Sequence, residues 1–359
     1  MKITYCSWLC NPRSSFYLVA QKHIKYLREK HGYNVVEVDG CNLRLLRLLP
    51  TDYVVLHPMF WSFFYCWDNR FELTYQLFKI RNTICSKIIA FETADSDMIS
   101  KQAVEIANFL PDIIAVPSEY ARRTFIRSGV TKPVKVIPHG VDNIFFSSKI
   151  NLDNPTIYKL YRTTDKKKIL FFCNHSWYRK GMDLVDKALR KLKRKDYVLV
   201  VKTHHGVEAK FIREKKFFKD LPLVHIDGWL GEEQLKTLID ASDIVLVPSR
   251  GGGFEMNGLE ALIRDKPIVY PEMSCISEYA KPIIPELEVK VTNYPIVLPN
   301  NRIHIGRGHE VDIDDFAEKI EYALDNSEEL QERIKERFKN KTEFTWERIV
   351  DKIVSEVLK

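Results

Sequence analysis

Short apolar runs alternate along the chain with segments in which apolar residues recur every three to four positions. The runs are rich in Val and Ile and end at polar, Pro or Gly residues, a pattern typical of buried strands. In the first part of the chain they lie at Ile3–Cys6, Tyr33–Val38, Asp52–His57, Lys87–Phe91, Asp112–Val116 and Val134–Ile137. The segments between them have helical spacing, which is clearest from Phe16 to Leu27. This alternation predicts a parallel, doubly wound sheet.

The same alternation starts again in the second part of the chain. Strands are predicted at Lys168–Cys173, Tyr197–Val201, Asp243–Val247 and Pro267–Tyr270. Residues from about 146 to 167 show neither the strand pattern nor the helical spacing. This stretch is interpreted as a linker or an ordered excursion between domains. The sequence therefore predicts an α/β fold of two Rossmann-like domains. In open sheets of this kind ligands bind outside the carboxyl ends of the strands, so we expect a site in a cleft between the domains.

One stretch, residues 247–261, combines the end of a strand, three consecutive glycines and the start of a helix. Pro248 ends the strand, Gly251–Gly253 form the loop, and apolar residues from Met256 onward have helical spacing. Such a loop brings backbone N–H groups and the positive end of a helix toward one point, which suits a phosphate. A tight turn without a ligand explains these residues equally well, so the context decides.

Length and composition place the chain among ordinary globular proteins. Its 359 residues exceed one typical core, and it is 45% hydrophobic and 29% charged. No apolar run approaches the roughly 18 residues that span a bilayer. The apolar start of the chain ends at Asn11–Arg13 before any cleavage site, so we expect no signal peptide and a cytoplasmic protein.

The cysteines carry no metal-binding or redox pattern. There are seven, an odd number, widely scattered and without a C-x-x-C pair. We predict that they are reduced and mostly in the core, and that there is no structural metal.

A net charge of +7 favours anionic ligands without choosing among them. Basic runs at 166–168, 187–195 and 210–219 are most simply solvated faces. In the last run Phe211, Phe217 and Phe218 interleave with lysines, which leaves peripheral contact with the inner face of a membrane as an alternative. Nucleic-acid binding through the basic faces is a rival hypothesis, although no nucleic-acid partner is expected.

Four segments, in order along the chain, resemble retaining glycosyltransferases of the GT-B fold, in particular glycosyltransferase family 4. They are 116–142, Arg179–Asp183, the glycine loop through Ala261 with Lys266–Val269 after it, and Phe344–Arg348. The resemblance covers almost the whole chain. It implies a Rossmann-like acceptor-side domain over residues 1–147, a nucleotide-sugar-binding domain over 148–340, and a C-terminal helix over 341–359 that crosses back to the first domain.

The resemblance also implies an activity. Members of the family move a hexose from a nucleoside-diphosphate sugar to a glycan, lipid or protein acceptor with retention of configuration. Attack from the face that the phosphate leaves, with that phosphate accepting the proton, requires no protein nucleophile. Fixed cations stabilise the leaving phosphate, and neither a metal nor another cofactor is expected.

Residue roles follow by position. We assign Lys180 to the β-phosphate, Arg179 to assist it through its fork geometry, and Glu92, after a strand of the first domain, to the sugar and acceptor. Glu260 is expected to accept hydrogen bonds from the ribose hydroxyls. The other donor-binding candidates are Ser249, Arg250, Gly252, Gly253, Phe254, Glu255 and His175. A solvated turn explains Arg179 and Lys180 without a ligand, an exposed loop carboxylate explains Glu92, and a helix-dipole contact explains Glu260.

Two segments depart from the family pattern. The family places two glutamates with seven residues between them; the second is Glu260, but the first falls at Gly252. Because that glutamate contacts the donor sugar in the family, a catalytically inactive GT-B protein that binds a nucleotide or glycan is the alternative. Glu255 is about 140° around a helix from Glu260, so it could reach the site only from the loop. His175 stands where many members have arginine, and the N-terminal loop at 11–15 lacks glycine. A sugar phosphorylase ranks lower, because no lysine is placed to hold a pyridoxal cofactor.

The aromatic segment from Phe60 to Trp67 is interpreted as core, with an acceptor-side wall as the alternative.

Overall fold

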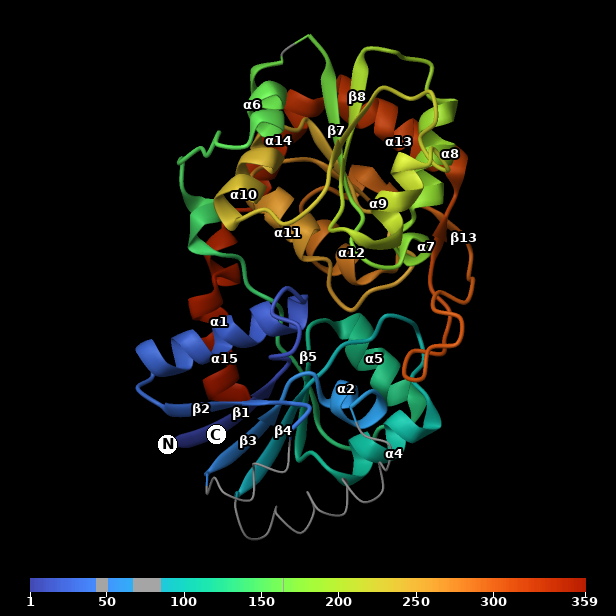
Figure 1. The fold of residues 1–359 in the computed structure, drawn as a ribbon. Helices are drawn as coiled ribbons and strands as arrows, with labels where there is room; N and C mark the ends of the chain where they lie inside the picture. Colours follow the sequence, from blue (N-terminus) through green and yellow to red (C-terminus); the bar gives the residue numbers. More distant parts are fainter. Residues whose placement is uncertain (43–50, 67–84, 164) are drawn as a thin grey trace. The chain divides into compact units, whose positions relative to one another are not determined.

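The computed structural model describes residues 1–42, 51–66, 85–163 and 165–359 (Figure 1). They divide into two compact units. The first comprises Met1–Gly140, Leu298–Gly306 and Thr342–Lys359, and the second comprises Val141–Val297 and Arg307–Lys341. The sequence predicts a boundary after residue 147, whereas this division follows Gly140.

The first unit is built on a parallel sheet of six strands. They are β1 (Lys2–Ser7), β2 (Asn34–Asp39), β3 (Tyr53–Leu56), β4 (Lys87–Phe91), β5 (Ile113–Val116) and β6 (Val134–Val136). Their order is β2-β1-β3-β4-β5-β6, and each neighbouring pair is parallel. Five of the predicted strand segments contain these strands or match them to within a residue, and β1 extends the sixth by one residue at each end.

Helices cover both faces of this sheet. They are α1 (Ser15–Glu29), α2 (Met59–Phe64), α4 (Lys101–Phe109), α5 (Glu119–Ser128) and α15 (Trp346–Glu356), with a 3-10 turn η4 (Lys341–Phe344) before α15. Figure 1 shows α1 and α15 together on one side of the strands and α2, α4 and α5 on the other. Alternate residues of the strands form a core with α2, α4 and α5, as the pleat of a sheet requires.

Local signals explain where these helices begin and end. The Ser14 hydroxyl caps α1 by accepting from the Tyr17 N–H, and Ser118 caps α5 in the same way. Gly129 ends α5 with a φ of +107°, which favours glycine. At α15 the chain approaches Gly140 so closely that a Cβ there would lie 2.7 Å from the Trp346 ring.

The aromatic segment is mostly core. Phe60, Phe63 and Phe64 are buried, while Trp61 stacks on Tyr65 with ring centroids 4.5 Å apart. Trp67 lies outside the described residues.

The prediction that every cysteine is reduced is wrong for one pair. Cys41 and Cys66 form a disulfide, with their Cα atoms 5.2 Å apart. Residues separated by 25 positions meet here because the chain returns to the same end of the sheet after β2 and after α2, and sequence spacing cannot reveal this. Cys10 and Asp39 place ligand-type atoms within 4.8 Å of the Cys41 sulfur, but that sulfur is already bonded. Cys6, Cys173 and Cys275 are buried and lie outside any disulfide of the described residues, as predicted.

The second unit contains another parallel sheet of six strands. They are β7 (Lys167–Phe172), β8 (Tyr197–Lys202), β9 (Leu223–Ile226), β10 (Ile244–Leu246), β11 (Ile268–Pro271) and β12 (Glu288–Val289), with a separate antiparallel pair β13 (Val291–Asn293) and β14 (Glu310–Val311). The order β12-β11-β10-β7-β8-β9 is that of a dinucleotide-binding sheet. The direction of winding reverses between the neighbours β7 and β10.

The helices of the second unit connect these strands. They are α6 (Pro155–Arg162), α7 (Trp177–Lys180), α8 (Met182–Lys191), α9 (Gly206–Arg213), α10 (Glu232–Asp240), α11 (Met256–Ile263), α12 (Cys275–Ala280), α13 (Ile313–Asp325) and α14 (Ser327–Arg337), with 3-10 turns η2 (Asn143–Phe146) and η3 (Pro285–Leu287). Helix α6 lies within the stretch predicted as a linker or ordered excursion. Asn154 caps it, Pro155 occupies its first turn, and Ile157 and Leu160 are buried, but two apolar residues are too few to establish a period.

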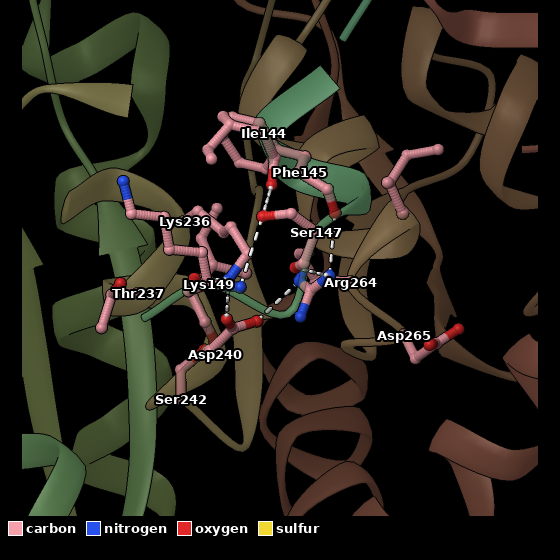
Figure 2. Close-up of polar contacts among 12 residues, drawn as sticks. Ile144, Phe145, Ser147, Lys149, Lys236, Thr237, Asp240, Ser242, Arg264 and Asp265 are labelled. Atoms are coloured by element: carbon pink, nitrogen blue, oxygen red, sulfur yellow. Dashed lines mark hydrogen bonds and ion pairs between the residues drawn. The ribbon is translucent and has the colours of Figure 1, made fainter. Parts of the chain in front are cut away.

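Two basic residues hold the chain that follows the division point. Figure 2 shows Arg264 donating to the carbonyl oxygens of Phe145 and Ser147, and Lys236 donating to that of Lys149. Asp240 accepts from both bases at 2.7 Å. These contacts attach residues 145–149 to the second unit, which is why the division falls before residue 147.

The lysines of the basic run at 210–219 are exposed, as expected of a solvated face, but one phenylalanine does not fit the membrane alternative. Phe218 is only 2% exposed, so its side chain belongs to the core and not to a membrane-facing layer. Phe211 and Phe217 are partly exposed, and the Lys216 ammonium lies 4.5 Å from the Phe211 ring centroid. Across the described ranges, no helix is long and apolar enough to cross a membrane.

Candidate functional site

Two loops of the second unit meet at the switch point of its sheet. One follows β7 and contains the short helix α7; the other follows β10 and contains the three glycines. Because β7 and β10 are neighbours, both loops leave the same edge of the sheet. Open α/β sheets bind ligands at such a point.

The two loops are joined through their backbones. Gly181 ends α7 with a φ of +77°, and a Cβ at this position would lie 2.5 Å from the carbonyl oxygen of Pro248. The Arg250 N–H donates to the Arg179 carbonyl at 2.7 Å, and Arg179 Nη1 donates to the Gly251 carbonyl at 2.9 Å. The basic turn and the glycine loop therefore form one structural element.

Arg250 lies at the centre of this element and is 1% exposed. Its guanidinium makes a bidentate contact with Asp183, with both N···O distances 2.7 Å, and also donates to Glu310 and to the Tyr178 carbonyl. It stacks over the Tyr178 ring at 4.0 Å. With a second contact to Glu310 at 2.6 Å, each of its five N–H groups has an acceptor among the described residues. Arg250 thus holds the loops together and directs no N–H toward a ligand.

Lys180 is paired with a carboxylate of the same loop system. Its Nζ lies 2.5 Å from Oε2 of Glu255. The Glu255 residue is 5% exposed, and the Lys180 side chain is mostly buried. The second oxygen of Glu255, Oε1, is buried and has no hydrogen-bond partner among the described residues. An unpartnered buried carboxylate oxygen is costly, and such groups occur at functional sites.

The Glu255 carboxylate occupies the space that a side chain at Gly252 would need. A Cβ built on Gly252 would lie 2.7 Å from Glu255 Oε1 and 3.5 Å from Arg179 Nη1. A carboxylate therefore lies beside the position where the family pattern predicts one, although it comes from a residue three positions later. The structure thus brings Arg179, Lys180, Gly252 and Glu255 together.

Helix α12 fixes the backbone from which Glu255 projects. The Tyr279 hydroxyl donates to the Glu255 carbonyl at 2.8 Å. Gly258 makes room for this contact, since a Cβ there would lie 2.5 Å from the Tyr279 oxygen. Glu255 precedes α11 with φ −104° and ψ 89°, so its side-chain direction does not follow the helical period.

Glu260 lies on α11 and is buried. Burial raises the pKa of its carboxyl to about 7, with Glu232 and Asp142 raising the pKa further, while a hydrogen bond from Asn257 at 2.9 Å opposes the shift. An open hollow of about 470 Å³ lies beside Glu232 and is lined by Ile144, Asn151, Gly231, Glu232, Glu233 and Gln234. Glu232 thus lines the hollow and also acts electrostatically on the Glu260 carboxyl.

The remaining donor-binding candidates differ in exposure. Ser249 and Gly253 are buried, and Phe254 is partly buried with its ring centroid 5.5 Å from that of Tyr279. His175 is exposed and has a φ of +58°, as does Ser176 after it. Non-glycine residues in this conformation store strain that the surrounding structure must hold.

Glu92 belongs to the first unit and is buried, not an exposed loop residue. Its Oε2 accepts from the Phe60 N–H at 2.7 Å and its Oε1 from the Thr93 N–H at 3.1 Å. Burial raises the pKa of this carboxyl to about 8 despite these hydrogen bonds. Glu92 therefore holds the first turn of α2, and its burial favours the protonated form.

Sequence reasoning missed three residues that build the site. Asp183 and Glu310 neutralise Arg250, and Tyr279 holds the backbone of Glu255. Asp183 had a signal in the sequence, since it ends the Arg179–Asp183 segment and lies in the first turn of α8. Glu310 and Tyr279 have none, because their contacts span 60 and 24 residues.

Comparisons with known proteins point to one family. Residues 153–341 match the model of "Glycosyl transferases group 1". A protein of Sulfolobus islandicus rod-shaped virus 1, known as uncharacterized protein 356, is 32% identical over 333 residues, which are 90% of this chain and 89% of the viral protein.

Solved structures share the architecture. A glycosyltransferase from Rickettsia africae superposes with a TM-score of 0.70 at 15% identity, covering 100% of this chain and 98% of that one. HepE from Anabaena, solved with UDP-glucose, superposes with a TM-score of 0.69 at 14% identity, covering 100% and 99%. The predicted fold class, GT-B with two parallel Rossmann-like sheets, is confirmed.

Proposed function

The chain belongs to the glycosyl transferases group 1 family, and on that basis we propose that it moves a hexose from a nucleoside-diphosphate sugar to an acceptor with retention of configuration. The acceptor is a glycan, a lipid or a protein. The diphosphate binds at the two loops of the second unit.

The observation that carries this proposal is the convergence of Lys180, Arg179 and an unpartnered carboxylate oxygen around Gly252. Two cations at a switch point suit the charge that develops on a departing phosphate. A carboxylate beside them suits the hydroxyls of a sugar, because it accepts up to four hydrogen bonds. Neither group requires a metal, so we propose transfer without one.

Glu260 and the hollow near it suit the nucleoside. Ribose hydroxyls that donate to the Glu260 carboxylate favour its charged form and lower the pKa that burial raises. The hollow, lined by backbone and polar side chains at the start of α10, offers space beside it. UDP-sugars are the donors to test first, because HepE, a protein of the same fold, was solved with UDP-glucose.

Retention follows from attack on the face that the phosphate leaves, with the phosphate accepting the acceptor's proton. Glu92, whose burial favours the protonated form, is proposed to donate a hydrogen bond to the sugar or acceptor. Peripheral contact with a membrane, if it contributes, rests on Phe211 and Phe217 and is tested by sedimentation with anionic vesicles.

Thermal unfolding with a nucleotide panel tests the donor site. The panel is UDP, GDP and ADP with their glucose or mannose conjugates. At a hundred times the dissociation constant a ligand adds about 2.7 kcal/mol to the free energy of unfolding, enough to raise the Tm measurably. We expect the nucleotides of one base, uracil, guanine or adenine, to raise the Tm. Lys180→Ala should abolish this shift.

Lys281→Ala is the matched control, because Lys281 also pairs with a glutamate, Glu288, at 2.7 Å in the same unit. It should keep the full shift. If no nucleotide raises the Tm, the proposal fails. Binding without sugar transfer to any acceptor, or to water, would favour the inactive binding protein that Gly252 suggests.

A further inference from the structure

We infer that the Lys180–Glu255 ion pair is a resting contact that the donor diphosphate breaks, and that the released Glu255 carboxylate binds the hydroxyls of the donor sugar. The inference rests on the proposed function. It adds a residue role and an exchange of partners that the family pattern does not contain, because that pattern places its carboxylate at the position of Gly252.

The first support is the state of the carboxylate itself. Oε2 of Glu255 is held by Lys180 Nζ at 2.5 Å, whereas Oε1 is buried and finds no partner in the part of the chain that the structure describes. The residue is 95% removed from solvent, since only 5% of it is exposed. One of the two carboxylate oxygens of Glu255 can therefore still accept a hydrogen bond, and none of the described residues donates one. A sugar hydroxyl is a suitable donor.

The second support is the space beside Gly252. Oε1 lies 2.7 Å from where a Cβ at 252 would be. Real Cβ atoms do not approach an oxygen so closely, so a side chain at 252 and the present position of Glu255 exclude each other. Gly252 and Glu255 are therefore two parts of one arrangement. Compared with the family pattern, the carboxylate comes from a residue three positions later in the loop, and glycine stands at the family's glutamate position.

The third support is electrostatic. A diphosphate carries more negative charge than a carboxylate, so it competes well for the single charge of Lys180. When Lys180 turns to the diphosphate, the Glu255 carboxylate loses the cation that paired with its Oε2. At the same time a second anion, the diphosphate, approaches it. That state is unfavourable for a bare nucleoside diphosphate and is relieved only when sugar hydroxyls donate to Glu255.

The consequence is a site that distinguishes a sugar nucleotide from the free diphosphate left after transfer. Glu255 repels the product and accepts hydrogen bonds from the substrate. Loss of the carboxylate charge should therefore affect the two ligands in opposite directions.

The test is isothermal titration of the full chain with UDP and with UDP-glucose, beside GDP, ADP and their conjugates, on the wild type and on Glu255→Gln. We expect Glu255→Gln to bind the matching nucleoside diphosphate about tenfold more tightly and its sugar conjugate about tenfold more weakly. Donor hydrolysis or transfer should fall by roughly a hundredfold.

Glu288→Gln is the matched control. Glu288 also pairs with a lysine at 2.7 Å, and its buried Oε1 also has no partner among the described residues, but it begins β12, two strands away from β10 in the sheet. It removes the same charge from the same unit and should change neither affinity. A double variant, Gly252→Glu with Glu255→Gly, returns the carboxylate to the family position and should recover most of the turnover that Glu255→Gln loses.

The outcomes separate the two proposals. If no nucleotide binds the wild type, the proposed function fails and the inference fails with it. If nucleotides bind and are turned over but Glu255→Gln weakens both ligands equally, or neither, the exchange of partners is wrong while the glycosyltransferase function stands. Unchanged circular dichroism and Tm establish that each variant is folded.

Discussion

The two units bury polar groups in opposite ways. In the second unit, charges are buried against charges: Arg250 contacts Asp183 and Glu310, and Lys180 contacts Glu255. In the first unit, one buried cluster, of Tyr5, His23 and His57, is held by hydrogen bonds between groups whose pKa shifts favour the neutral form. The Tyr5 hydroxyl lies 2.8 Å from Nδ1 of both His23 and His57, and burial lowers the pKa of each imidazole.

The difference between the ionic network and the neutral cluster follows from their structural roles. A buried ionic network costs desolvation but fixes loops in one geometry, which a phosphate site requires. A neutral cluster costs less and packs like a core. In the first unit it connects β1, α1 and β3, and the His23 ring also contacts that of Trp346 in α15.

The largest effect should come from breaking the ionic network. Arg250→Met leaves Asp183 and Glu310 without their buried cation, and we expect the free energy of unfolding of the second unit to fall by about 3–5 kcal/mol. Urea unfolding measures the loss, with nucleotide binding measured in parallel.

Arg264→Met is the comparison variant, because Arg264 pairs with Asp240 but is partly exposed. It should cost less. An equal loss in both variants would mean that the fully buried contacts of Arg250 stabilise the second unit no more than the partly exposed contact of Arg264. The ionic network would then not be what distinguishes this unit from the first.

A medium effect should come from acid acting on the neutral cluster. The pKa of His57 is lowered from 6.5 in the unfolded chain to about 3 in the folded one. A depressed folded pKa gives stability that is complete above pH 6.5 and is lost as the pH falls toward 3, by about 2 kcal/mol between pH 6.5 and 5. Burial also lowers the pKa of His23, and that of His139 to about 4, so the loss adds to this.

Glu92 opposes this loss, because its pKa is raised to about 8 in the folded chain. The folded chain therefore takes up a proton as the pH falls before the unfolded chain does, and this uptake stabilises the folded state. The measurement is therefore made on Glu92→Gln beside the wild type, by hydrogen exchange of β1 and β4 corrected for the intrinsic rate. The variant should lose stability more steeply than the wild type below pH 6.5. Equal slopes would show that Glu92 does not oppose the loss, and a variant whose stability does not fall below pH 6.5 would show that the histidines do not control this unit.

The smallest effect should come from Tyr5→Phe. It removes one hydroxyl shared by two imidazoles and leaves no charge unpaired, so we expect a loss of about 1–2 kcal/mol in urea unfolding. Val55→Ala in β3 serves as a packing control for this unit. A loss as large as that of Arg250→Met would remove the distinction between neutral and ionic burial.

The sequence predicts the sheets well, because buried parallel strands are continuous apolar runs whose pattern is local. It also predicts that Arg179, Lys180 and the glycine loop share a site, since each lies just after a strand and strand ends meet at one edge. What it could not predict are pairings between distant positions. Arg250 with Glu310 and Cys41 with Cys66 follow only from the complete fold.

Glu255 shows another limit of sequence reasoning. A helical projection separates Glu255 from Glu260 by about 140°, but it applies only to residues inside a helix. Glu255 has non-helical backbone angles and precedes α11, so its side chain points toward Gly252 instead. A residue at a helix boundary can therefore occupy a position that its spacing alone rules out.

The attachment of residues 145–149 has a consequence for how the sequence can diverge. Arg264 and Lys236 bind only carbonyl oxygens of this segment, which every amino acid possesses. Relatives can therefore exchange the side chains of Ser147 and Lys149 without losing these contacts to the backbone. Evolutionary constraint should fall instead on Lys236, Asp240 and Arg264, three positions far from the segment that they secure.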